Sequence, residues 1–98
     1  MENTLDNDAI THDAASRRFT TTRDGQEAVL EYEREGDVLV ITHTIVPPAL
    51  GGRGIAGQLV ETALRYARSE GLKVLPRCSY ADAYMRKHAG YADLRLQS

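Results

Sequence analysis

Hydrophobic and polar positions follow the two-residue period of strands over the first half of the chain. Residues 27–34 ("EAVLEYER") alternate between apolar and charged side chains, which is the pattern of a half-buried strand. Residues 38–46 ("VLVITHTIV") are nearly all apolar or β-branched and predict a central strand, reached through a hairpin turn at 35–37. Residues 17–22 ("RRFTTT") predict a short edge strand. The first half is therefore expected to form antiparallel strands.

The hydrophobic period changes to that of a helix beyond a glycine-rich stretch. Apolar residues recur at helical spacing over 52–70, and Gly71 follows in the position where helices commonly end. Residues 72–76 ("LKVLP") predict a short buried strand, because they are apolar and end at a proline. Residues 80–89 predict a second, shorter helix closed by Gly90.

These elements predict an α+β fold. The strand 38–46, the helix 52–70 and the strand 72–76 form a β-α-β unit, whose strands should be parallel and joined by a right-handed crossover. The expected sheet is mixed, with antiparallel strands, one β-α-β unit and a C-terminal helix. Residues 1–16 are polar, lack a clear period and carry four acids without Lys or Arg, so they predict a flexible acidic tail. The remaining residues, 17–98, predict one folded domain.

Charge and cysteine content narrow the class of protein. Residues 17–98 carry 12 basic and 10 acidic groups, a balance too even for a nucleic-acid binder. No apolar run approaches the ~20 residues that cross a bilayer. The single cysteine, Cys78, excludes an internal disulfide and fits a reducing compartment. We therefore expect a cytoplasmic protein without nucleic-acid or membrane partners. One cysteine and three scattered histidines also predict no metal site.

Four glycines lie around the start of the predicted long helix, in "ALGGRGIAGQL" (49–59). One of them, Gly57, falls inside the helical pattern, where glycine costs about 1 kcal/mol relative to alanine. A strand that enters a glycine-rich turn and then a helix can bind an anion, because the first helical turn has free N–H groups and a partial positive charge. Arg53 could add a charge-assisted contact to a phosphate. The alternative is a structural turn with tight helix–sheet packing.

The spacing of the glycines discriminates between phosphate-binding motifs. A P-loop requires a lysine after the glycines, and none follows them here. The letters "GRGIAG" (52–57) match Gly-x-Gly-x-x-Gly, but the acid expected about 20 residues later on a following strand is missing. Glu70 instead closes the helix, and the chain is too short for a doubly wound sheet.

The stretch "GGRGIAGQLVETAL" resembles the acyl-CoA pyrophosphate loop of the GNAT acetyltransferase superfamily, whose motif is Arg/Gln-x-x-Gly-x-Gly/Ala. Gly54 and Ala56 fill the last two marked positions, whereas Gly51 departs from the Arg or Gln of the first. Nearly all of the chain outside the acidic tail is similar to a small GNAT-like family of N-acetyltransferase-domain proteins. The further marks of that family are Pro-x-Cys-Ser-Tyr (76–80), a histidine and a Tyr-x-Asp-Leu ending (91–94). Ala89-Gly90 stands where members often have Pro-Glu.

This resemblance implies a minimal GNAT-like acyl-CoA N-acyltransferase fold that binds acetyl-CoA. The pyrophosphate would lie on the glycine loop and helix N-terminus, and the pantetheine arm between the two parallel strands. The residues expected to contact acetyl-CoA are Thr44, Ile45, Val46, Gly51, Gly52, Arg53, Gly54, Ile55, Ala56, Tyr80 and His88.

The expected reaction is transfer of the acetyl group to an unidentified amine acceptor. A short chain lacks the walls that orient a small acceptor, so either a large acceptor such as a protein brings its own surface, or transfer passes through Cys78. A non-catalytic acetyl-CoA-binding or sensing module is an alternative, and so is a small interaction domain for a phosphate-bearing partner. We expect a monomer or a weak homodimer that covers an open sheet edge.

Cys78 is the candidate nucleophile. It lies near the start of the second predicted helix beside Arg77, and both features favour the thiolate. The thiolate could attack the thioester and give an acetyl-cysteine intermediate. The alternative is a buried, inert cysteine that fills space.

Tyr84 and His43 are the candidate acid and base. Tyr80, Tyr84 and His88 share one helix face, and the resemblance implies that a tyrosine in this region protonates the departing thiolate, for which we select Tyr84. The alternative is an ordinary amphipathic core face with capped hydroxyls, which accounts for at least one of these tyrosines. His43 alternates with Leu39, Ile41 and Ile45 on the central strand; it is a candidate general base, although a lone histidine on such a face is more often a satisfied core residue.

Overall fold

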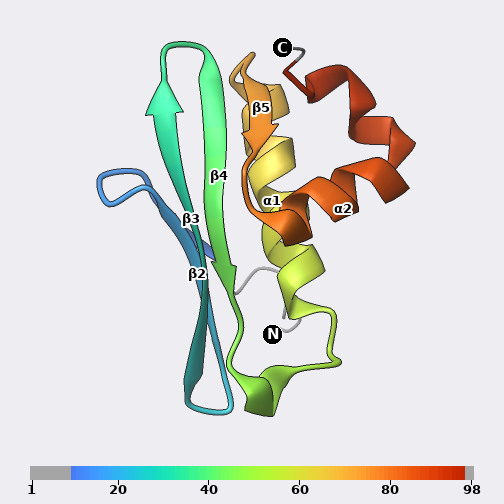
Figure 1. The fold of residues 1–98 in the computed structure, drawn as a ribbon. Helices are drawn as coiled ribbons and strands as arrows, with labels where there is room; N and C mark the ends of the chain where they lie inside the picture. Colours follow the sequence, from blue (N-terminus) through green and yellow to red (C-terminus); the bar gives the residue numbers. More distant parts are fainter. Residues whose placement is uncertain (1–9, 97–98) are drawn as a thin grey trace.

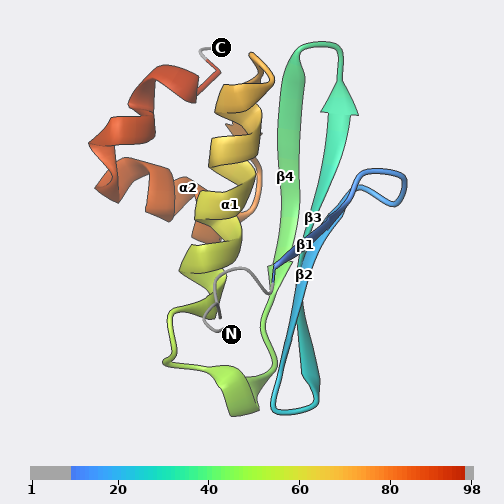
Figure 2. The ribbon, with the colours of Figure 1, turned by 180° about the vertical axis from the view of Figure 1, so that it is seen from behind.

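The computed structural model describes residues 10–96 of the 98-residue chain. One face of a five-stranded sheet carries all the helices, and the view from behind shows the same two layers (Figures 1 and 2). In chain order the elements are β1 (Thr11–Asp13), β2 (Arg18–Arg23), β3 (Gln26–Glu35), β4 (Val38–Ile45), the 3₁₀ helix η2 (Pro48–Leu50), α1 (Ile55–Ser69), β5 (Lys73–Pro76), α2 (Ser79–Lys87) and the 3₁₀ helix η3 (Ala89–Leu94).

The sheet has the order β1-β2-β3-β4-β5 and confirms the predicted α+β class. Strands β1 to β4 pair antiparallel, and β4 pairs parallel with β5 from Val38↔Lys73 to Ile41↔Pro76. The β-α-β unit predicted from the change of period is therefore present, with α1 as its helix. Its helix begins at Ile55, because Gly54 precedes it with φ +76° and ends the loop.

Strand β1 corrects the expectation of a flexible tail through residue 16. Its three residues pair with Arg18–Thr20 of β2, so β2 is not an edge strand over that stretch. The physical reason is His12, whose ring stacks on Phe19 with centroids 4.1 Å apart and lies 2.6 Å from the Tyr32 hydroxyl through Nε2. The other part of the expected tail, residues 1–9, lies outside the described residues.

A β-bulge interrupts the pairing of β3 with β4. Glu31 pairs with His43 and Tyr32 pairs with Ile41, so Thr42 is an additional residue on β4. The Thr42 hydroxyl donates a hydrogen bond of 3.1 Å to the Glu31 carbonyl. A bulge shifts the alternation of side chains by one residue, so β4 presents a different face to the helices after Thr42 than simple alternation predicts.

Helix α2 is shorter than predicted. It ends at Lys87, because His88 leaves the helical region with φ −121° and ψ 84°. Gly90, expected to close this helix, lies in η3 instead. Gly71 has φ +72° just beyond α1, as expected of a glycine that ends a helix.

Over residues 10–96, one hydrophobic core fills the space between the sheet and the helices. Its fully buried members include Leu30 of β3, Leu39 of β4, Leu59 of α1 and Val74 of β5. The core fixes α1 across the sheet and so places the N-terminus of α1 beside the end of β4. Among the described residues, no helix has the length and apolar character needed to cross a membrane.

Candidate active site

The parallel strands β4 and β5 diverge after Ile41. The N–H groups of Arg77 and Cys78 both donate to the Ile41 carbonyl, at 3.0 and 3.1 Å. Strand β4 continues to Ile45, whereas β5 ends at Pro76 and the chain turns into α2. The last four residues of β4 therefore lie beyond the stretch paired with β5.

A cleft of about 340 Å³ lies at the end of β4 and the start of α1. Its lining residues are Val46, Leu50, Gly51, Gly52, Gly54, Ile55, Ala56 and Tyr80. All of them except Leu50 belong to the set expected from the sequence to contact acetyl-CoA. Leu50 was missed because it is a buried apolar residue, 1% exposed, at the end of η2; the preceding Pro47-Pro48 was the available signal for a turn that points a side chain inward.

The backbone of the glycine loop adopts conformations that other residues avoid. Gly52 and Gly54 have φ +82° and +76°, in the left-handed region. A Cβ at either position would have no neighbour within 4 Å, so the backbone angles rather than crowding favour glycine there. Helix α1 begins directly after Gly54, so its first-turn N–H groups and partial positive charge lie beside the cleft.

Gly57 serves a different purpose, the close approach of α1 and α2. A Cβ on Gly57 would lie 3.3 Å from the Tyr80 hydroxyl and 3.4 Å from the Tyr84 ring. Both tyrosines therefore pack over this glycine. Because Tyr80 lines the cleft and is 43% exposed, the small residue at 57 also sets the position of one cleft wall.

Cys78 lies where the strands diverge, at the N-cap of α2. Its thiol donates a hydrogen bond of 3.4 Å to the Thr44 hydroxyl. Thr44 pairs with Leu30, a core residue, and so faces the helices. The side chain of Cys78 is partly buried, packs against the core and is a free thiol. The structure thus places Cys78 in hydrogen-bond contact with Thr44, a residue predicted to contact acetyl-CoA, at the point where β4 and β5 diverge.

His43 does not share the face of Leu39 and Ile41, contrary to the alternation read from the sequence. The bulge at Thr42 pairs His43 with Glu31, on the sheet face opposite the helices, and His43 Nδ1 lies 3.4 Å from a Glu31 carboxylate oxygen. Its side chain is 65% exposed. Ile45 shares that outer face, because it pairs with Val29. Neither residue lines the cleft.

Tyr84 and His88 stack on one another on α2, with ring centroids 3.8 Å apart. His88 Nδ1 lies 2.8 Å from the Tyr84 carbonyl oxygen, the acceptor of this bond, and neither His88 nor Tyr84 lines the cleft. Burial raises the pKa of Tyr84, and the nearby Glu61 carboxylate acts in the same direction. The hydroxyl therefore stays protonated at neutral pH and retains a proton to donate.

Contacts from the β2–β3 turn hold the glycine loop and the first turns of α1. Arg53 Nη2 lies 2.6 Å from an Asp24 carboxylate oxygen, so its guanidinium points to that turn and does not line the cleft. Arg23 donates a hydrogen bond of 3.1 Å to the side-chain carbonyl of Gln58. No local pattern in the sequence predicts this contact, because the two residues are 35 positions apart in the chain.

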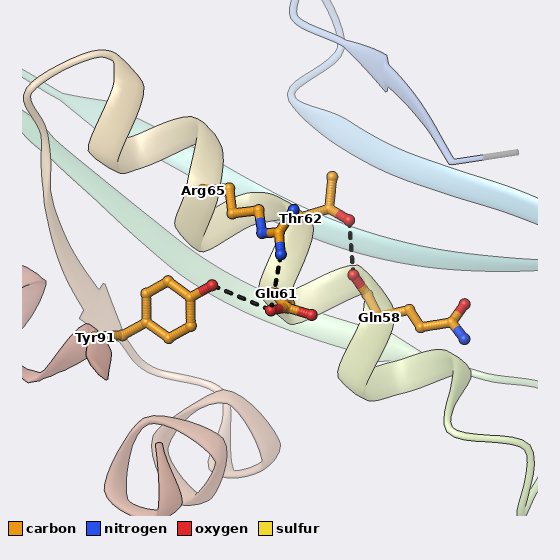
Figure 3. Close-up of polar contacts among 5 residues, drawn as sticks. All are labelled: Gln58, Glu61, Thr62, Arg65 and Tyr91. Atoms are coloured by element: carbon orange, nitrogen blue, oxygen red, sulfur yellow. Dashed lines mark hydrogen bonds and ion pairs between the residues drawn. The ribbon is translucent and has the colours of Figure 1, made fainter. Parts of the chain in front are cut away.

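Polar contacts along α1 also fix the C-terminal segment, as Figure 3 shows. The Tyr91 hydroxyl of η3 donates to Glu61 at 3.2 Å, and Arg65 pairs with the same carboxylate at 3.4 Å. The hydroxyl of the next residue, Thr62, donates to the carbonyl of Gln58 one turn before it, at 2.7 Å. None of these residues lines the cleft. Over residues 10–96, no three His, Cys, Asp or Glu side chains group in a way that could hold a metal ion.

A mixed sheet with helices on one face, a parallel pair that diverges and a glycine-rich helix N-terminus define a GNAT-like acyl-CoA N-acyltransferase fold. A GCN5-like protein from Staphylococcus aureus, solved by NMR, shares this fold with a TM-score of 0.72 and 27% identity, over 91% of this chain and 88% of that chain.

Sequence comparison identifies the family. The family described as GCN5-related N-acetyl-transferase matches residues 18–94. Protein NATD1 of Gallus gallus is 39% identical over 82 residues, which cover 81% of this chain and 74% of the relative. Protein NATD1 of Homo sapiens is likewise 39% identical, with 81% and 73% covered. The chain therefore belongs to the GCN5-related N-acetyltransferase family, which confirms the resemblance seen in its motifs.

Proposed function

We propose that this protein binds acetyl-CoA in the glycine-lined cleft and transfers the acetyl group to an amine of an acceptor yet to be identified. The observation that carries the proposal is the position of the cleft at the end of β4, next to the stretch where β4 and β5 diverge. One extended ligand could thus place a phosphate group in the cleft and a narrow arm where β4 and β5 diverge. Family membership supports the same reaction class.

The residues present fit such a ligand. The first-turn N–H groups of α1 and the left-handed Gly52 and Gly54 offer donors and close backbone approach to a pyrophosphate. Val46 and Ile55 supply apolar surface on the cleft wall. Bound acetyl-CoA would supply an activated thioester at this site.

Cys78 is the residue we propose as nucleophile. Its sulfur lies at the divergence of the strands, and the hydrogen bond to Thr44 orients the thiol there. The Thr44 hydroxyl can accept a hydrogen bond from the thiol or donate one to the thiolate. When Cys78 takes the acetyl group, the CoA sulfur would leave as a thiolate, and Tyr84 is the proposed donor of a proton to it, since the Tyr84 hydroxyl remains protonated at neutral pH. His43 lies on the sheet face opposite the helices, beside Glu31, and is therefore not proposed as the base.

The amine acceptor is proposed to be carried by a protein. Apart from Tyr80 of α2, the cleft is lined only by the stretch from Val46, just after β4, through η2 and the glycine loop to the first turn of α1, among the residues that the structure describes. A small amine would therefore find few groups to orient it, whereas a protein brings its own surface.

Intact-protein mass spectrometry with acetyl-CoA tests the function, using the wild type, Cys78→Ala and Cys78→Ser. A native-spray adduct of acetyl-CoA with all three proteins is the expected result. One acetyl group retained under denaturing conditions by the wild type alone would establish that Cys78 takes the acetyl group from acetyl-CoA, the first step of a transfer through Cys78. An adduct without a retained acetyl group would leave direct transfer or a binding module. An adduct with inorganic pyrophosphate and none with acetyl-CoA would overturn the proposal in favour of a phosphate-binding interaction domain.

A further inference from the structure

The β2–β3 turn and the glycine loop meet at one end of the molecule, where Figure 1 shows both at the foot of the sheet. Two contacts join them to each other and to α1. Arg23 donates to Gln58, and Arg53 forms a close ion pair of 2.6 Å with Asp24. A carboxylate therefore lies directly beside a loop whose backbone is otherwise suited to an anion.

Arg53 is positioned to serve either Asp24 or a ligand. It lies between Gly52 and Gly54, which line the cleft, yet its own side chain is turned to Asp24. The side chains of Arg53 and Asp24 are 50% and 65% exposed. Exposed ion pairs of this kind contribute little to stability, so the guanidinium can exchange its partner at low cost.

We infer that Asp24 sets the affinity of the glycine loop for phosphate-bearing ligands by holding Arg53 and by placing a negative charge beside the cleft. The inference rests on the proposed function. A bound phosphate must compete with the Asp24 carboxylate for Arg53 and is repelled by that carboxylate. Removal of the charge should release the guanidinium and strengthen binding, most clearly at low ionic strength.

The sign of the effect separates this inference from a structural role. If the ion pair only kept the loop in shape, its removal would loosen the loop and weaken binding. Asp24→Asn is a suitable variant, because Asp24 has φ +52° and asparagine readily adopts that left-handed conformation. Asp37→Asn is the matched control, since it removes the same charge from the β3–β4 turn at the opposite end of β3.

Isothermal titration calorimetry with CoA and with inorganic pyrophosphate, on full-length protein at low and moderate salt, tests the inference. We expect Asp24→Asn to lower the Kd for CoA about threefold to tenfold at low salt, and Asp37→Asn to leave it unchanged. The gain should shrink when Arg53→Gln is added, because the released guanidinium is then absent.

An unchanged or weaker affinity of Asp24→Asn for CoA would overturn the inference and leave the proposed function intact. Equal gains in Asp24→Asn and Asp37→Asn would overturn it as well, because net charge alone would then explain them. Failure of the wild type to bind CoA would overturn the proposed function instead. In that case the pyrophosphate titration decides the inference, which fails if Asp24→Asn does not tighten pyrophosphate binding relative to the wild type.

Discussion

Two glycines near the start of α1 are needed for different physical reasons. Gly54 has a left-handed φ of +76° at the N-cap of the helix, with open space where a Cβ would lie. Gly57 is helical, and a Cβ there would lie tightly against the Tyr80 hydroxyl and the Tyr84 ring, at 3.3 and 3.4 Å. Alanine at position 54 therefore measures the cost of an unfavourable backbone conformation, and alanine at position 57 measures the cost of a tight packing contact.

Gly54→Ala is expected to destabilise the protein by about 1 kcal/mol, because an L-residue with a left-handed backbone costs roughly 1–2 kcal/mol. The loop should relax toward another conformation, and the affinity for CoA should fall with it. Urea denaturation followed by circular dichroism measures the first effect, and calorimetric titration the second. Unchanged stability would show that the loop does not need its left-handed turn.

Gly57→Ala is expected to change the free energy of unfolding by less than about 1 kcal/mol, because improved helix propensity offsets the tight contacts with the two rings. Tyr80 must give way, however, and it forms one wall of the cleft. The Kd for CoA should therefore rise severalfold while the urea midpoint hardly moves. Equal affinity in Gly57→Ala and wild type would contradict a role for this close approach in the site.

The cleft residues were predicted best where backbone conformation and the small size of a side chain determine which residue is present. Glycines followed by a helical period predicted the loop that lines the cleft, and the next residues, Ile55 and Ala56, also line it. The sequence pattern misplaced His43, because a single additional residue at Thr42 reverses the faces of β4 and no local signal marks that bulge. The Asp24–Arg53 contact depends on tertiary packing and lay beyond any local pattern.

At the scale of elements, strand β1 shows that a short polar segment can form a strand that its sequence pattern does not predict. Three residues are too few to display a period, so nothing in their pattern predicted a strand. The segment is held by the His12 ring, which stacks on Phe19 and packs edge-on against Tyr66 with centroids 4.4 Å apart. Longer elements with a clear period, such as α1 and β3, were predicted correctly to within a few residues.

The attachment of β1 is expected to depend on pH through His12. Burial lowers the pKa of His12 below its ordinary value of 6.5, against a smaller opposing effect of Asp13. The unfolded chain therefore binds a proton more readily than the folded one, and unfolding takes up a proton between the two pKa values. The contribution of His12 to stability is full above about pH 6.5 and is lost as the pH falls through the lower folded value.

His12→Gln should remove this part of the pH dependence, and urea midpoints between about pH 7.5 and pH 5 measure it. Hydrogen bonds from arginines lower the pKa of Asp82 and of Asp93 below 3.8, so these carboxylates lose their contribution only in more acidic solution. The two effects therefore fall in separate pH ranges. A wild-type midpoint that does not change from pH 7.5 to pH 5 would contradict the assignment to His12.

At the scale of the whole molecule, one core joins every layer of the fold. Side chains from β2, β3, β4, α1, β5, α2 and η3 belong to the same buried cluster. The C-terminal segment is fastened to it by the ion pair of Arg68 with Asp93 at 2.7 Å and by the hydrogen bond of Leu96 N–H to the Val74 carbonyl at 2.8 Å. The class of fold was predictable because a β-α-β unit restricts how the sheet and α1 can pack. The position of the helices on one face of the sheet was not predicted, because it depends on how the whole core assembles.

A shared core predicts that the protein unfolds in one cooperative transition. Leu59 of α1 is fully buried against the sheet, so Leu59→Ala should cost about 2–5 kcal/mol, a large part of the 5–15 kcal/mol typical of such a domain. Ile45→Ala is the matched control, since Ile45 is 52% exposed on the outer face and its truncation should cost less than about 0.5 kcal/mol. Far-UV circular dichroism follows the helices and tyrosine fluorescence follows the packing. In both variants the two signals should share one midpoint, lowered strongly for Leu59→Ala, because no element can lose this core and persist alone. A helical signal that outlasts the tyrosine signal would show instead that α1 and the sheet unfold separately.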